Sequence, residues 1–197
     1  MRRIALIAGL AILPAAWGVV RLPGGMIGHM AGHMAVVAIA APLIAIGLRG
    51  GRWDPARLGW IAPLPMSVVE LLVVWGWHLP VARAWVALSP LATMLEQAMF
   101  LGAGLLLWAA SLGGHAPERR AAGVIALLLT SMHMTLLGAL IALAPRPLFA
   151  MHGHIGMGAL ADQQLGGVVM LLVGAGSYLA GGVAMLAGVL HVEGRMA

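Results

Sequence analysis

The sequence predicts an all-helical protein: a polytopic membrane bundle of about six transmembrane helices with both termini in the cytoplasm. Of its 197 residues, 62% are apolar and 9% are charged, and the mean hydropathy is +1.01, well above the values of soluble domains. Long apolar runs alternate with short breaks rich in Pro, Gly and Arg. Because a bilayer accepts helices that are apolar on every face, we expect residues 1–197 to form a single transmembrane helical domain.

Six apolar segments are each long enough to cross a hydrocarbon layer of about 30 Å. They span residues 4–20, 26–48, 63–79, 91–112, 121–144 and 162–190. The first segment follows Arg2 and Arg3 and contains small residues at Ala15 and Ala16, so it is also compatible with a signal peptide. Its removal would leave five spans in an unchanged orientation.

The arginines indicate the topology, since the chain has eleven Arg and no Lys. With a cytoplasmic N-terminus, eight arginines lie inside and three, Arg21, Arg83 and Arg146, lie outside, in agreement with the positive-inside rule. They stand singly or in pairs at the ends of apolar segments rather than in a stripe. We therefore expect the lipid bilayer, and no nucleic acid, as the partner of this basic chain.

The histidines gather toward the predicted external side of the membrane. This orientation places His29 and His33 near the outer end of the second segment, His78 at the outer end of the third, and His152 and His154 in the last external loop. The chain has no cysteine, so a metal ion would have to be held by His, Met or carboxylate groups.

His29 and His33 carry the most informative local pattern. Residues four apart share a helix face at a spacing of about 6 Å, so both imidazoles can reach one ion. Met30 and Met34 repeat this spacing one residue further round the helix. Imidazole and thioether ligands together favour copper, especially Cu(I), although methionine is also common in apolar helices.

Three ionisable groups are predicted deep in the membrane: His33, Glu70 and His133, the last roughly 16 Å below the outer boundary at 1.5 Å per residue. Groups at this depth indicate a functional site by default, and the alternative is a structural hydrogen bond such as Glu70 to His133. His133 stands between Met132 and Met134. At most one of these methionines can join it at an ion, because adjacent helical residues point about 100° apart.

Three further features have expected supporting roles. Glu96 could neutralise bound charge or orient a histidine by hydrogen bonding. Asp162 is interpreted first as the N-cap of the last helix and second as a group that orients a ligand histidine or receives an incoming ion. The loop with His152 and His154 could capture copper, or remain a solvated loop without ligands.

Signatures of catalysis are absent from the sequence. It has no P-loop, no dinucleotide-binding glycine fingerprint, no nucleophile elbow and no His-Glu-x-x-His motif. We therefore expect a protein that is not an enzyme.

Several motifs between His29 and Tyr178, taken in order, resemble the multi-span CtaG family of cytochrome c oxidase assembly proteins. They are His29-Met30-x-x-His33-Met34 with Pro42-Leu43 and Gly47, Trp77-His78-Leu79-Pro80, Glu96 with Phe100 and Trp108, Leu137 to Ile141 with Pro147-Leu148-Phe149, and Asp162-Gln163-Gln164-Leu165-Gly166-Gly167. Each motif is weak alone, whereas the ordered set is specific. One departure is that many members have histidines in the fourth helix where this chain has Thr93 and Gln97.

The resemblance implies a bacterial inner-membrane protein that helps to build a haem-copper oxidase by handling copper for its metal centres. Its site residues would be His29, His33, His78, Glu96 and Asp162. The implied partners are cytochrome c oxidase subunits and, as a further candidate, a periplasmic copper chaperone. We expect Cu(I) to be bound near the external face and passed on by a chaperone-like assembly factor.

Three other functions remain open from the sequence. Paired histidines could bind haem in a membrane cytochrome, Glu70 and His133 could be waypoints of a copper transporter, or the protein could be a metal-free scaffold. Because ligating imidazoles must be unprotonated, copper affinity is predicted to fall as the pH drops through the histidine range.

Overall fold

The computed structural model describes residues 1–21, 25–114, 116–149 and 156–193, and the described chain is helical with no strands. Its elements are α1 (Arg2–Arg21), α2 (Gly25–Met34), the π-helix η1 (Ala35–Ala40), α3 (Ala41–Leu48), the 3-10 helix η2 (Pro55–Arg57), α4 (Pro63–Trp77), α5 (Pro80–Leu88), α6 (Pro90–Leu112), α7 (Pro117–Ala142), α8 (Ala159–Val169), the π-helix η3 (Met170–Ala175) and α9 (Gly176–Glu193). The predicted all-helical fold class is therefore confirmed.

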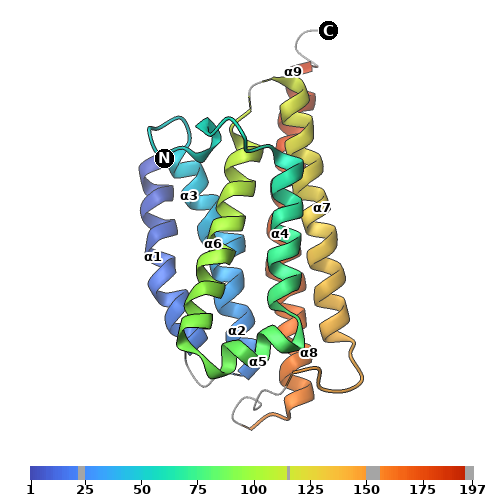
Figure 1. The fold of residues 1–197 in the computed structure, drawn as a ribbon. Helices are drawn as coiled ribbons and strands as arrows, with labels where there is room; N and C mark the ends of the chain where they lie inside the picture. Colours follow the sequence, from blue (N-terminus) through green and yellow to red (C-terminus); the bar gives the residue numbers. More distant parts are fainter. Residues whose placement is uncertain (22–24, 115, 150–155, 194–197) are drawn as a thin grey trace.

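Long helices run alternately in opposite directions along the bundle (Figure 1). Residues 25–48 form one continuous helical rod through α2, η1 and α3, and residues 159–193 form another through α8, η3 and α9. The start of α1 and the end of α9 lie at the same end of the bundle, whereas α5 and the start of α8 lie at the other (Figure 1). This arrangement agrees with termini on one side of a membrane, and the side itself stays a prediction from the arginines.

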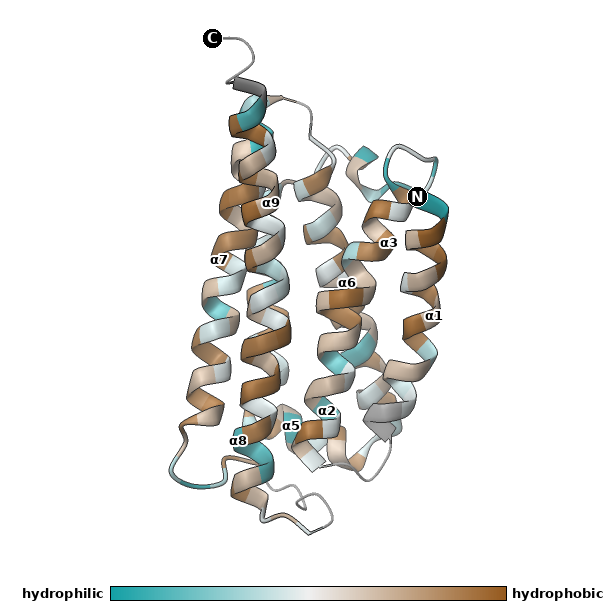
Figure 2. Ribbon diagram, turned by 180° about the vertical axis from the view of Figure 1, so that it is seen from behind, coloured by the Kyte–Doolittle hydropathy of each residue, from teal (hydrophilic) through white to brown (hydrophobic). Residues whose placement is uncertain are grey.

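The lengths and composition of the helices fit a membrane. Among the described residues, four helices are long and apolar enough to cross: Gly25–Leu48, Pro90–Leu112, Pro117–Ala142 and Ala159–His191. The bent pair α4 and α5 would make a fifth span, and the crossing of α1, predicted at residues 4–20, stays a prediction. Most of the residues along the helices are apolar (Figure 2). Outward-facing side chains such as Leu72 and Leu172 are 64% and 73% exposed, as expected for surfaces that contact lipid.

Helix α5 was not predicted from the sequence. Helix α4, which covers most of the predicted third span, ends at Trp77 rather than at residue 79, and the chain then bends by 68° into Pro80–Leu88. Both α5 and α6 begin at a proline, because proline fits the first turn of a helix, where its missing N–H is not needed. The predicted break at residues 80–90 therefore contains a short helix across one end of the bundle (Figure 1).

The rod of residues 25–48 occupies the centre, packed against α1, α6 and α8. Pro42 in this rod has no N–H to offer to a carbonyl one turn earlier. Side chains of α9 contact carbonyls of that turn: Ser177 Oγ donates to the carbonyl of Ala38 at 2.6 Å, and the Tyr178 hydroxyl lies 3.2 Å from the carbonyl oxygen of Val37. These contacts anchor the rod against α9.

Candidate metal centre

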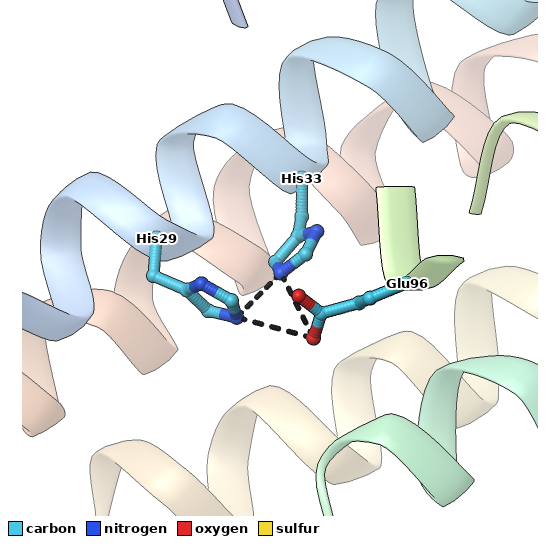
Figure 3. A group of neighbouring side chains, drawn as sticks. All are labelled: His29, His33 and Glu96. Carbon is cyan, nitrogen blue, oxygen red and sulfur yellow. Dashed lines mark hydrogen bonds and ion pairs between the residues drawn. The ribbon is translucent and has the colours of Figure 1, made fainter. Parts of the chain in front are cut away.

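Two histidines of α2 and one glutamate of α6 converge inside the bundle (Figure 3). His29 and His33 lie one turn apart on the same helix face, as their spacing predicts, and their Nε2 atoms are in hydrogen-bond contact. Each Nε2 atom also lies 3.5 Å from Glu96 Oε1. All three side chains are buried, with His33 and Glu96 fully so. The three candidate ligand atoms lie within 4.8 Å of one another, close enough for a single ion.

A fourth group, Arg83 of α5, is part of this cluster. Its Nη1 donates to Glu96 Oε1 at 2.5 Å and its Nη2 donates to His29 Nδ1 at 3.2 Å. The sequence predicted Arg83 as an external topology marker, and the side of the membrane on which it lies stays a prediction. Its side chain is not exposed at the end of the bundle but buried. The signal that could have identified it is a single charge within a nine-residue apolar segment that begins at Pro80.

Gln97 and Phe100 of α6 complete the wall around His33. Gln97 Nε2 lies 3.2 Å from His33 Nδ1, and the Phe100 ring packs at 4.3 Å between centroids. Gln97 also lines a pocket of about 390 Å³ between α1 and α6. Gln97, at which the sequence departs from the expected family pattern, therefore contacts the cluster as a hydrogen-bonding partner of His33.

His78, the C-cap residue of α4, is brought to the same region. Its Nδ1 donates to the carbonyl of Val74 at 2.6 Å, which leaves the unprotonated Nε2 available as a ligand. That Nε2 atom is buried and has no hydrogen-bond partner within the described ranges. The ring centroid lies 6.2 Å from that of His33, so His78 is a candidate third imidazole.

Binding of a metal ion to His29 would require the loss of its hydrogen bond from Arg83. A neutral imidazole has one N–H and one lone pair, so a metal ion at Nε2 puts the proton on Nδ1. A protonated Nδ1 cannot accept from Arg83. A cation and the Arg83 guanidinium therefore compete for both His29 and Glu96.

The methionines of α2 lie on the face next to that of His29 and His33. Met34 is buried with its Sδ 2.7 Å from the position that a Cβ of Gly174 would take. Met30, one turn earlier, is also fully buried and shares the stripe of Met34. The structure thus directs Met34 toward η3, and the predicted ligand roles of both methionines stay predictions.

The deeper predicted groups lie apart from the cluster. Glu70 is fully buried and accepts a hydrogen bond from the Tyr178 hydroxyl, so the predicted pairing with His133 is wrong. His133 is buried, and neither of its ring nitrogens has a hydrogen-bond partner in the part of the chain that the structure describes. Its neighbour Met132 is 67% exposed, whereas Met134 is fully buried.

Asp162 caps a different helix from the one predicted. Gly158, not Asp162, is the N-cap of α8. The Asp162 carboxylate instead accepts from the backbone N–H groups of Met26 at 2.6 Å and Ile27 at 3.2 Å, which satisfies unpaired donors at the start of α2. Asp162 therefore supports the helix that carries the histidines. His152 and His154 lie outside the described residues.

The fold and this cluster define a polytopic membrane protein with a buried His, Glu and Arg centre. The family model for the cytochrome c oxidase caa3 assembly factor (Caa3_CtaG) matches residues 2–191, and the chain belongs to this family. This match confirms the resemblance found in the sequence motifs. No curated protein and no solved structure matches the chain.

Proposed function

We propose that this oxidase assembly factor binds copper, as Cu(I), at the cluster of α2 and α6 and helps to metallate a haem-copper oxidase. The observation that supports this most directly is the convergence of His29 Nε2, His33 Nε2 and Glu96 Oε1 within 4.8 Å in a buried place. The protein acts as a chaperone for the ion rather than as an enzyme, and its partners are subunits of the oxidase.

The donor set suits this cargo. Neutral imidazoles bind copper well, and His78 offers a third one with its orientation fixed by a backbone carbonyl. Glu96 can neutralise the charge of the ion when Arg83 releases it. Because the cluster is assembled from three helices, binding does not depend on a flexible loop.

The position of the cluster supports copper delivery from the external side of the membrane. Its Arg83 belongs to α5, which lies at the end of the bundle opposite the start of α1 and the end of α9 (Figure 1). Under the positive-inside rule that end is the external side. The protein then resides in the bacterial cytoplasmic membrane with this end toward the periplasm. His152 and His154 would collect copper there from a periplasmic chaperone and pass it to the cluster.

Oxidase maturation in cells tests this function. A strain whose only copy carries His29→Ala and His33→Ala is expected to contain the variant in its membranes but to lose most oxidase activity and oxidase copper. The control is His191→Ala, which removes an imidazole at the other end of the bundle. Normal copper in the oxidase of the double variant would contradict the proposal and favour a metal-free scaffold, and a Soret band in the purified protein would favour haem binding.

A further inference from the structure

The methionines of α2 form a row on a different face from the histidine cluster. Met26, Met30 and Met34 follow at intervals of four residues and are at most 1% exposed, so they form one buried stripe along the helix. The stripe faces the rod of α8 and η3. Met26 Cγ lies 2.9 Å from the Cβ position of Gly166 in α8.

Three thioether side chains from three elements meet at Gly174 of η3. Its Cβ position lies 2.7 Å from Met34 Sδ of α2, 3.7 Å from Met134 Sδ of α7 and 3.8 Å from Met170 Cγ of η3 itself. The sulfurs of Met34 and Met134 therefore lie within about 6.4 Å of each other, the sum of the first two distances. All three methionines are at most 1% exposed.

The backbone is shaped to admit the sulfur of Met34. A Cβ at residue 174 would approach that sulfur more closely than real Cβ atoms do, so any larger residue there would move the Met34 sulfur from its present position. Both rods also become π-helical at this level, since η1 begins directly after Met34 and η3 contains Met170 and Gly174. Single π-helical turns within α-helices are frequent at functional sites.

Thioethers are neutral, soft ligands that favour Cu(I) over Zn²⁺, Mg²⁺ or Ca²⁺. We propose that Met34, Met134 and Met170 form a second metal site, which takes a soft monovalent cation such as Cu(I). Since Met34 follows His33 directly in the chain, α2 carries an imidazole site on one face and a thioether site on the other. The use of this site as a second position for oxidase copper rests on the proposed function, whereas binding itself does not.

Metal stoichiometry and ligand identity test this site. The detergent-purified full chain is titrated with Cu(I), and with Ag(I) as a probe that does not change oxidation state, and the bound copper is examined by X-ray absorption. The variants are Met34→Leu/Met134→Leu, which keeps apolar volume while removing both sulfurs, and His29→Ala/His33→Ala. The matched control is Met132→Leu/Met185→Leu, which removes two thioethers away from Gly174.

We expect two ions in the wild type and in the control. The methionine variant is expected to keep one ion with nitrogen and oxygen ligands, and the histidine variant to keep one ion with sulfur ligands. Unchanged stoichiometry in the methionine variant, or no sulfur ligand in the histidine variant, would overturn the thioether site. A single sulfur-bound ion in the wild type would uphold this site and overturn the histidine site instead.

Gly174→Ala provides an independent test that removes no ligand. The added methyl group has to displace Met34 Sδ, so we expect at least a tenfold weaker affinity for Ag(I) at the sulfur site. Gly176→Ala, where a Cβ meets nothing within 4 Å, is the control. Equal Ag(I) affinities in the two glycine variants would contradict the proposal.

Discussion

At the scale of single residues, Arg83 decides how the cluster behaves without an ion. It pairs with Glu96 in a buried place, where an uncompensated carboxylate would cost several kcal/mol. It also donates to the His29 nitrogen that must carry the proton when Nε2 binds a metal. The guanidinium thus stabilises Glu96 within the cluster and would oppose binding of the proposed ion.

Arg83→Met tests this competition. We expect the metal-free variant to unfold at a lower temperature, because Glu96 loses its partner, and to bind Cu(I) about tenfold more tightly, or by roughly 1.4 kcal/mol. Thermal unfolding in detergent, with and without Cu(I), and competition titrations measure both effects. Arg146→Met, at an exposed position, should change neither, and weaker binding in Arg83→Met would show that Arg83 supports the ion rather than competes with it.

Proton competition gives a second prediction at this scale. A proton and a copper ion compete for the same lone pairs of His29 and His33. Both imidazoles are buried beside the Arg83 guanidinium, which disfavours an additional positive charge there, so affinity at the histidine cluster should change by less than about tenfold between pH 7.5 and pH 5 and fall only at lower pH. Equilibrium titrations with a chelator competitor at each pH measure this change. A steep loss of affinity between pH 7.5 and pH 6 would contradict binding by these buried imidazoles.

At the scale of helices, Asp162 connects two distant segments. Its carboxylate accepts from the first turn of α2, while the neighbouring Gln163 accepts from the Leu148 N–H at 2.6 Å. The polar triplet of residues 162–164 therefore holds together the loop after α7 and the start of the helix with the histidines. Its role is to position that helix rather than to bind an ion.

Asp162→Ala should accordingly destabilise the protein by about 1 kcal/mol or more and weaken Cu(I) binding, because the start of α2 loses its cap. Asp162→Asn keeps an acceptor and should recover most of both losses. Unfolding temperature and Cu(I) affinity are measured for the two variants side by side. If both variants bound as weakly as His29→Ala/His33→Ala while remaining folded, Asp162 would act at the ion itself.

Much of this helical level could be predicted from the sequence, because apolar length and arginine breaks determine membrane spans directly. The convergence of His29 and His33 follows from helical spacing alone. What the sequence could not show depends on contacts between distant segments. Arg83 falls in a segment predicted as a loop, and its burial depends on the packing of α5 across the end of the bundle. Glu70 is paired with Tyr178, which lies 108 positions away in the sequence.

At the scale of the whole molecule, topology determines which compartment the cluster serves. The absence of native cysteine permits labelling of single introduced cysteines in intact cells. Pro147→Cys and Gly59→Cys are exposed positions, in the segment after α7 and in the segment before α4. A membrane-impermeant maleimide should label Pro147→Cys and spare Gly59→Cys until the membrane is opened, and the reverse pattern would place the cluster on the cytoplasmic side.

The central claim is that His29 and His33 hold copper within an oxidase assembly factor. The most direct measurement is the copper stoichiometry and Cu(I) affinity of the purified wild type beside His29→Ala/His33→Ala, with His191→Ala as control. We predict that the double variant alone loses the ion with nitrogen and oxygen ligands. Retention of that ion with wild-type affinity, or a wild type that binds no ion through nitrogen, would contradict the claim.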